Sequence, residues 1–354
     1  MRGRARPLIV ICTMERPVLT TLALLIAAPF VCAQPRITAG DPVDLFTGLY
    51  VNTSTDIALD STPPIAIRRV YRPEDRMSRA FGIGTNHNYD IFLVGDHDPY
   101  TYIDLILEDG GRVHFARTSR GKSFEDAVYR HAGTHTQYEN AVLAWNSSWR
   151  GWDMKLQDGS LCQFPESRWA QRGSQAALIR IQDPQGNSLQ FVRSAAGDLT
   201  RVVSSSGRKL ALTYDAGHRV TLIHDDAGRS VQYAYDAKGR LVQVVGVDGS
   251  TIAYSYDDRD RMLTVGDAEG NLSLRMVYDH AGRCVRQILP DGRSFRFAYT
   301  TAAKGKTLRV DVIQPDGAHE RVIFNAAGYP VSDTVIPAAG EQPLRTTSAF
   351  TPTR

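Results

Sequence analysis

The sequence has few cysteines and no marked excess of charge of either sign. Its 354 residues include only four cysteines, and 41 basic residues nearly balance 38 acidic ones. A disulfide-rich scaffold is therefore excluded, and a strongly basic nucleic-acid-binding domain has no electrostatic support. Only Cys162 and Cys284 lie beyond residue 33. They fall in different expected domains, so two free or buried thiols are favoured over a disulfide.

Long hydrophobic runs are also lacking. The longest run, residues 18–31, has fourteen residues, whereas a membrane-spanning helix needs about 20. It ends at Val31-Cys32-Ala33, a small-residue pattern typical of signal-peptidase cleavage before Gln34. We therefore predict a signal peptide over residues 1–33, starting at Met1 or Met14, and a periplasmic or secreted protein. An uncleaved anchor remains an alternative, but we expect no stable membrane span after cleavage.

Removal of this leader changes the charge balance. The segment 1–33 contains four arginines and one glutamate, so the mature chain is neutral. The apparent basicity therefore belongs to the export signal, and we expect no nucleic-acid partner.

The sequence also lacks recognisable catalytic motifs. It contains no Gly-x-Ser-x-Gly nucleophile elbow, no phosphate-binding glycine loop followed by lysine, and no EF-hand pattern. We therefore predict that the protein is not an enzyme and carries no cofactor and no metal. An enzyme of the cell envelope stays a third hypothesis, because two carboxylates distant in sequence can meet in a fold.

What the second half does contain is a regular repeat. A glycine recurs every ten or eleven residues, and a Tyr-Asp pair precedes every second one. The glycine series includes Gly207, Gly217, Gly228, Gly239 and Gly249, then Asp260 in place of glycine, then Gly270, Gly282 and Gly292. The pairs are Tyr214-Asp215, Tyr235-Asp236, Tyr256-Asp257 and Tyr278-Asp279. A repeat of this length indicates one supersecondary unit that buries its face only against neighbouring units.

Each unit is predicted to be a β-hairpin. Apolar residues alternate between the glycines, as in Leu210, Leu212 and Tyr214, and this period is typical of strands with one buried face. Glycine and aspartate between them favour tight turns. We expect an all-β fold in which about twelve antiparallel strands follow in sequence order and form a curved sheet.

Arginine follows glycine at many of these turns. The pairs are Gly207-Arg208, Gly228-Arg229, Gly239-Arg240, Gly282-Arg283 and Gly292-Arg293. Solvated arginines at the margins of the sheet are the simpler interpretation. A ladder of ion pairs with the turn aspartates is the alternative.

The unit Tyr235-Asp236-Ala237-Lys238-Gly239-Arg240-Leu241 is similar to the YD repeat of Rhs proteins, and Tyr278–Arg283 is a second near-complete copy. Before the repeats, the phrases 40–48, 69–71 and 81–89 resemble the N-terminal domain of that family, with Thr85 where the family usually has tryptophan. We accordingly divide the chain into a signal peptide (1–33), an Rhs-type N-terminal β domain (34–175), YD repeats (176–336) and a flexible tail (337–354).

The resemblance implies a role as well as a fold. Rhs repeats form strips of a hollow β-shell that encloses a toxin, and longer family members continue into a core motif and a toxin domain. Neither follows the repeats here, so self-cleavage and toxicity are not carried over. The implied function is that of a non-catalytic scaffold, a partial shell in toxin delivery or cell-surface interaction. Its expected partner is a toxin or a remaining shell segment.

Four tryptophans lie close together in the sequence, between residues 145 and 169. Such a cluster can form an aromatic core or an exposed platform for sugar rings. Trp145 and Trp149 flank a polar Asn-Ser-Ser segment and are the candidate ligand-binding residues. They support the alternative function, a stand-alone module that binds cell-surface glycans or other envelope ligands.

Overall fold

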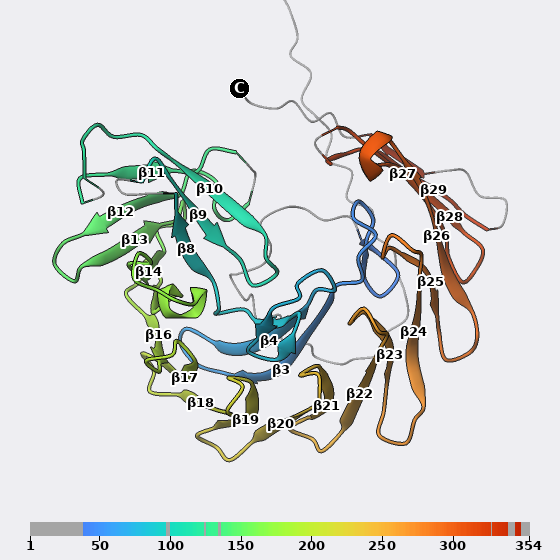
Figure 1. Ribbon diagram of the computed structural model, residues 1–354, viewed down its shortest axis with the longest axis horizontal. Coiled ribbons are helices and arrows are strands. Elements are labelled where there is room, and N and C mark those ends of the chain that lie inside the picture. The colour runs from blue at the N-terminus through green and yellow to red at the C-terminus, as the bar shows by residue number, and fades with distance from the viewer. Residues whose placement is uncertain are drawn as a thin grey trace, which may run out of the picture.

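The protein is almost entirely β-structure in the computed structural model, which describes residues 38–96, 100–123, 125–133, 136–326, 328–338 and 344–347. These residues contain thirty strands and two single-turn 3₁₀ helices, which confirms the all-β prediction (Figure 1). Within this part of the chain, neither helix is long or apolar enough to cross a membrane. The predicted signal peptide, residues 1–33, lies outside the described residues.

The N-terminal segment, residues 38–91, forms three small antiparallel sheets: β1–β2, β3–β4–β7 and β5–β6. Their strands are β1 (Thr38–Ala39), β2 (Val43–Asp44), β3 (Asn52–Leu59), β4 (Ile65–Tyr71), β5 (Ser78–Arg79), β6 (Gly82–Ile83) and β7 (Thr85–His87).

The large sheet begins at β8, and its first part precedes the repeats. Its elements are β8 (Phe92–Gly95), β9 (Tyr102–Ile106), β10 (Arg112–Arg117), β11 (Val128–Arg130), β12 (Val142–Asn146), β13 (Gly151–Lys155), β14 (Leu161–Pro165), η1 (Gly173–Ala176) and β15 (Arg180–Gln182). A bridge between Phe92 in β8 and Ala177, just before β15, makes this part curl back on itself.

The same sheet continues through the repeats. Its elements there are β16 (Ser188–Arg193), β17 (Leu199–Ser204), β18 (Lys209–Tyr214), β19 (Val220–Asp225), β20 (Ser230–Tyr235), β21 (Leu241–Val245), β22 (Thr251–Tyr256), β23 (Met262–Gly266), β24 (Leu272–Tyr278), β25 (Cys284–Ile288), β26 (Ser294–Thr301), η2 (Ala303–Gly305), β27 (Thr307–Ile313), β28 (His319–Phe324), β29 (Pro330–Ile336) and β30 (Leu344–Thr347).

Every strand from β16 to β29 pairs antiparallel with the next one in sequence. This order is the one that the hairpin repeat predicts, and the sheet sweeps around in a wide arc (Figure 1). Pairing continues without interruption across the expected boundary at residues 175/176. Within the expected tail, residues 344–347 form β30, which pairs with β29.

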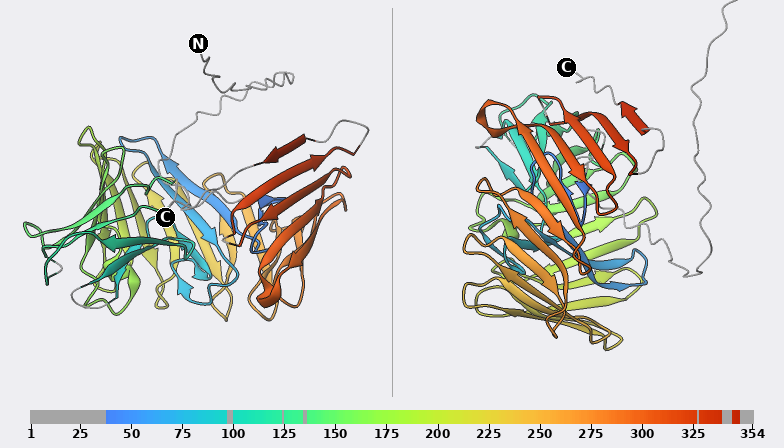
Figure 2. Two further views of the ribbon diagram at one scale, coloured as in Figure 1. Left: turned by 90° about the horizontal axis from the view of Figure 1, so that it is seen from above. Right: turned by 90° about the vertical axis from the view of Figure 1, so that its right-hand side faces the viewer.

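The N-terminal segment lies on the concave side of this arc, where β3 and β4 pass close to β19–β21 (Figures 1 and 2). Its earliest residues meet the latest strands, and the β3–β4 hairpin then runs toward β17, where Ser204 donates to the Thr62 carbonyl, and turns back to Tyr254 in β22. Four aromatic contacts mark its course. They are Phe46–Phe324 (5.3 Å between ring centroids), Tyr71–Tyr256 (6.1 Å), Phe81–Tyr233 (4.8 Å) and Tyr89–Phe191 (4.5 Å).

A buried ion pair fixes β3 and β4 against the sheet. Arg69 is 2% exposed, and its guanidinium binds both carboxylate oxygens of Asp56, at 2.9 and 3.0 Å. The Tyr233 hydroxyl donates to Asp56 at 2.8 Å, and the Tyr254 hydroxyl accepts from Arg69 at 3.2 Å. Burying a charge is costly unless it is paired and hydrogen-bonded. Two strands of the repeat region therefore supply the groups that make this burial tolerable.

The Arg69→Met variant should be strongly destabilised, because it leaves the Asp56 carboxylate buried without its cation. We expect a loss of about 3–5 kcal/mol in the free energy of unfolding, measured by urea denaturation. The double variant Arg69→Met/Asp56→Leu removes both charges and should recover much of this loss. A single variant that is no less stable than the double variant would contradict the role assigned to the ion pair.

Candidate functional site: the repeat ladder and the segment bound to it

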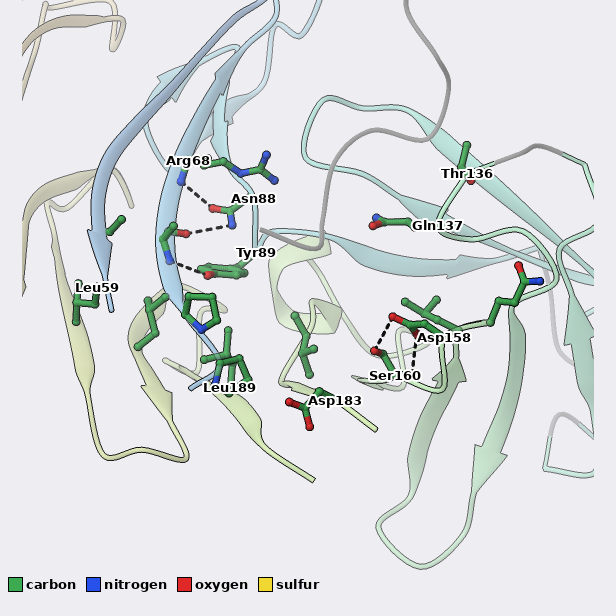
Figure 3. A pocket seen from close by; sticks show the side chains of 18 residues that line it. Leu59, Arg68, Asn88, Tyr89, Thr136, Gln137, Asp158, Ser160, Asp183 and Leu189 are labelled. Carbon is green, nitrogen blue, oxygen red and sulfur yellow. Dashed lines mark hydrogen bonds between the residues drawn. The ribbon is translucent and has the colours of Figure 1, made fainter. Parts of the chain in front are cut away.

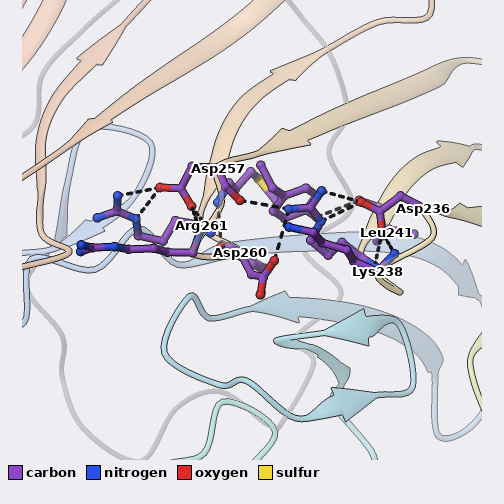
Figure 4. A network of polar contacts seen from close by, with 11 residues as sticks. Asp236, Lys238, Leu241, Asp257, Asp260 and Arg261 are labelled. Atoms are coloured by element: carbon purple, nitrogen blue, oxygen red, sulfur yellow. Dashed lines mark hydrogen bonds and ion pairs between the residues drawn. The ribbon is translucent and has the colours of Figure 1, made fainter.

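Each Tyr-Asp pair stands at a turn that its aspartate closes. Asp236 accepts the backbone N–H groups of Lys238 and Arg240 on Oδ1, at 3.0 and 2.9 Å. Its Oδ2 accepts Nε of Arg240 at 2.7 Å (Figure 4). Gly239 occupies the left-handed region with φ of 86°, which glycine adopts without steric cost. The aspartate thus caps the turn and orients the arginine that follows.

The left-handed position of this turn is not always the glycine of the periodic series. It is held by His218, Gly239, Asp260 and Gly282, with φ of 60°, 86°, 62° and 89°. Asp260 stands in for glycine as the spacing predicts. Gly217 does not have this role, because the turn places His218 there, one residue later. Histidine and aspartate are among the non-glycine residues that tolerate this conformation best.

The arginine after each turn forms two contacts. It pairs with the aspartate of its own turn, in Arg219–Asp215, Arg240–Asp236, Arg261–Asp257 and Arg283–Asp279, at 2.6–2.8 Å. It also lies over the ring of the next tyrosine, in Arg219–Tyr235, Arg240–Tyr256, Arg261–Tyr278 and Arg283–Tyr299, at 4.6–5.1 Å from the centroid. The four arginine side chains are 15–24% exposed. At this margin the structure therefore has the ion-pair ladder rather than freely solvated arginines.

Two of these arginines do not follow a glycine, so the Gly-Arg pattern does not identify them. Arg219 follows His218 and Arg261 follows Asp260. A signal for both was present in the sequence, since an arginine stands four residues after every aspartate of the four pairs. At the opposite margin, Arg229 and Arg293 also pair with turn aspartates, but their side chains are 42% and 61% exposed.

The tyrosine hydroxyl completes the link between neighbouring units. It donates to the carbonyl of the residue that follows the previous turn, at 2.6–3.0 Å. The pairs are Tyr214–Leu199, Tyr235–Val220, Tyr256–Leu241, Tyr278–Met262 and Tyr299–Cys284. Phenylalanine could fill the same space but could not make this bond, so the hydroxyl explains why the repeat uses tyrosine.

The residue that receives this bond lies at a β-bulge. In the hairpin β18–β19, Thr213 pairs with Leu222 but Tyr214 pairs with Val220, so that one residue is left over. The same shift occurs at Tyr235, Tyr256 and Tyr278. A bulge leaves a backbone N–H group without a partner in the regular pairing of the two strands. This N–H group therefore needs a partner elsewhere in the protein.

The N-terminal segment supplies the partners of three bulge N–H groups. These bonds are Val220 N–H to the Ala80 carbonyl (2.7 Å), Met262 N–H to the Tyr71 hydroxyl (2.8 Å) and Cys284 N–H to the Gly48 carbonyl (2.7 Å). In the remaining repeat, Ile83 N–H bonds the Gly239 carbonyl at 3.1 Å. The ladder, meaning the tyrosines, aspartates and arginines of these turns and the bulges beside them, therefore holds neighbouring units together. It also binds residues 38–91.

The protonation states suit this arrangement. Partial burial would raise the pKa of Asp215, Asp236, Asp257 and Asp279, but hydrogen bonds from the paired arginine outweigh it and lower the pKa of each. Their stabilisation is thus present above the unfolded pKa and is lost as the pH falls through the folded value. Burial raises the pKa of the ladder tyrosines, so their hydroxyls keep the donated proton.

Two family models match this chain, one over the repeats and one over the N-terminal segment. The family model described as Teneurin YD-shell matches residues 175–310, which contain the ladder. A second model, described as a domain of unknown function (DUF6531), matches residues 40–115, which include most of the bound N-terminal segment. The chain is an Rhs/YD-repeat protein. Its fold is a shell-like β-scaffold. No curated protein matched the sequence.

Several solved structures resemble this YD-repeat protein at low identity. A TcdB2-TccC3-Cdc42 structure matches with a TM-score of 0.37 and 10% identity, covering 84% of this chain and 15% of its own. A Photorhabdus luminescens Tc holotoxin pore matches with a TM-score of 0.27 and 9% identity, covering 84% and 20%. The YD-repeat protein thus spans about a fifth or less of the length of these chains.

The two candidate tryptophans lie away from the ladder, at the β12–β13 hairpin. Trp145 is half-buried and packs edge-to-face on the buried Trp152, at 5.3 Å. Trp149 is also half-buried, and its Nε1 donates to Asp153 Oδ1 at 3.1 Å. Their role as ligand-binding residues stays a prediction. The exposed member of the group is Trp169, at 80%.

The two cysteines are separate thiols. Cys162 in β14 and Cys284 in β25 are both free and buried. Burial raises the pKa of each thiol to about 12, so neither is a reactive thiolate at neutral pH.

The Tyr256→Phe variant should lose stability, because the buried Leu241 carbonyl would keep no hydroxyl donor. We expect a decrease of about 1–3 kcal/mol in the free energy of unfolding, measured by chemical denaturation. Tyr102→Phe, at a tyrosine that is 36% exposed, is the matched control and should change little. Equal effects of the two substitutions would show that the hydroxyl bond of the ladder contributes nothing special.

Proposed function

We propose that this YD-repeat protein is a non-catalytic, exported scaffold that forms part of a shell around a toxin partner and acts in toxin delivery or cell-surface contact. The proposal joins the expected signal peptide, residues 1–33, to the shell-type architecture of the repeats. Its partner is a toxin or a remaining shell segment.

The observation that carries the proposal is the uniform linkage of the arc. Each unit from Tyr214 to Tyr299 is tied to the preceding one by a hydroxyl–carbonyl bond, and from Tyr235 onward also by an arginine–tyrosine contact. Such a surface holds its curvature by repetition, as solenoid proteins do. A stiff, curved wall suits enclosure of a partner better than it suits catalysis, which requires a concentrated cluster of reactive groups.

The alternative, a stand-alone glycan-binding module, receives less support. Stacking of sugar rings needs an accessible aromatic face, whereas Trp145 and Trp149 are half-buried. Trp169 is accessible, and Arg168 lies 5.6 Å from its ring centroid. A glycan would therefore have to stack on Trp169, whose ring is exposed, rather than on Trp145 or Trp149.

The scaffold role can be tested by expressing the full chain, with a C-terminal affinity tag, together with the products of the adjacent reading frames. We expect the tagged protein in the periplasm or medium with Gln34 as its first residue, in a stoichiometric complex with one of these products. The partner should resist protease in the complex and be digested alone.

Two results would contradict the proposal. One is a tagged protein that keeps residues 1–33 and stays in the cytoplasm. The other is an adjacent product that is digested at the same rate with and without the scaffold. An unrelated exported β-protein with the same tag controls for non-specific protection.

A further inference from the structure

The outer face of the last part of the sheet carries a row of arginines. On β24–β28, one set of side chains faces the N-terminal segment. Gln287 bonds the Asp41 backbone at 2.7 and 2.9 Å, and Phe324 contacts Phe46. The side chains that alternate with this set lie on the convex side of the arc (Figure 1). They include one arginine on each of the five strands, the outer arginine row: Arg275, Arg286, Arg296, Arg309 and Arg321.

The row has little opposite charge around it. Among the residues of these five strands, all of which the structure describes, Asp311 is the only acidic residue on the convex face, and Glu320 alternates onto the concave face. Asp311 pairs with both Arg309 (2.8 Å) and Arg321 (2.6 Å). Five arginines against one aspartate give this face a net charge of +4, whereas the chain from residue 34 onward is neutral.

Two of the arginines oppose each other directly. Arg286 in β25 pairs in register with Arg296 in β26, and like charges at opposite cross-strand positions destabilise a sheet. Arg275 and Arg296 are exposed and have no hydrogen bond or ion pair with any described residue. Arg286 donates to Ser294 Oγ at 3.1 Å and has no carboxylate partner in the described part of the chain. These three guanidinium groups therefore keep donors that a bound anion can use.

Polar groups in a hollow elsewhere on the molecule are, by contrast, held within the protein. A pocket of about 500 Å³ lies beside the β3–β4 hairpin (Figure 3). There the Asn88 side chain accepts the Arg68 backbone N–H at 2.9 Å, and Asp158 accepts the Ser160 hydroxyl at 3.0 Å. Such groups have little left to offer a polar ligand, whereas the outer arginine row does.

The arrangement of the row suits an extended polyanion. Neighbouring strands lie about 4.8 Å apart, so a row across five strands extends about 19 Å along the outer face. Guanidinium groups bind carboxylates and tetrahedral oxyanions with paired hydrogen bonds. A polymer with anionic groups along its chain can therefore contact several arginines at once.

The same face lacks features that nucleic acids and membranes use. The five aromatic side chains of these strands belong to the core or pack against it, so the outer face offers no platform on which bases could stack. A broad sheet face does not enter a DNA groove as a helix or a two-stranded ribbon does. Its exposed Val277 and Ile323 are short aliphatic side chains, not the large apolar groups that insert into a bilayer.

We propose that the outer arginine row binds an extended anionic polysaccharide, one with sulfate or carboxylate groups along its chain. The guanidinium groups of Arg275, Arg286 and Arg296 bind the anionic groups, and the aliphatic side chains between them contact the sugar rings. This role rests on the proposed function, because it supplies the ligand of the cell-surface contact. It uses the convex face, so the concave side stays available to a toxin partner.

The test is calorimetric titration of the purified full chain with heparin. Uncharged dextran, a DNA duplex and phosphatidylserine vesicles are the comparison ligands. We expect saturable binding of heparin, weaker binding of the duplex and the vesicles, and no binding of dextran. The triple variant Arg275→Gln/Arg286→Gln/Arg296→Gln should weaken heparin binding about tenfold or more, because charge-assisted hydrogen bonds are lost.

The matched control removes the same charge outside the row. It is Arg112→Gln/Arg208→Gln/Arg229→Gln, at side chains that are 69%, 36% and 42% exposed, and it should leave heparin binding nearly unchanged. Arg296→Gln alone should not lower the thermal unfolding temperature, because it removes the repulsion from Arg286. A lower temperature would assign Arg296 a structural role and overturn the proposal.

The proposal is also overturned if heparin shows no saturable binding, or if the two triple variants weaken its binding equally. Tighter binding of the duplex or of the vesicles than of heparin would overturn it as well. None of these results changes the protease protection of a toxin partner, so failure of the polysaccharide site is distinct from failure of the scaffold role.

Discussion

The structure depends on how the bulge after each Tyr-Asp turn is satisfied. At Val220, Met262 and Cys284, the carbonyl receives a tyrosine hydroxyl from the next unit, and the N–H bonds the N-terminal segment. Buried backbone groups without partners are costly. At these three bulges the same residue therefore connects its unit both to the next unit and to residues 38–91, so the repeats and the N-terminal segment support one another.

This constraint explains why the N-terminal segment is irregular. Five of its seven strands have only two or three residues, and the seven are divided among three small sheets, because the segment must reach bulges that recur along the arc. The buried pair Arg69–Asp56, held by Tyr233 and Tyr254, fixes its position between these points. The segment therefore lines the concave side of the repeats (Figure 1).

The repeat was predictable from the sequence, and the lining was not. Alternation around Leu210 and Leu212 predicts strands, and the spacing of the Tyr-Asp pairs predicts hairpins in sequence order. Local chemistry placed the left-handed residue one position away from Gly217, at His218, because aspartate capping rather than glycine defines that turn. The bond between Gly48 and Cys284 joins residues with no shared pattern, so periodicity could not reveal it.

The central claim is that residues 38–91 complete the bulges of the ladder, and amide hydrogen exchange measures this directly. We expect the N–H groups of Val220, Met262 and Cys284 to exchange as slowly as those in the middle of the neighbouring strands, because each is bonded to the N-terminal segment. Exchange of these three amides at the rate of exposed turn residues, while the strands stay protected, would contradict the account.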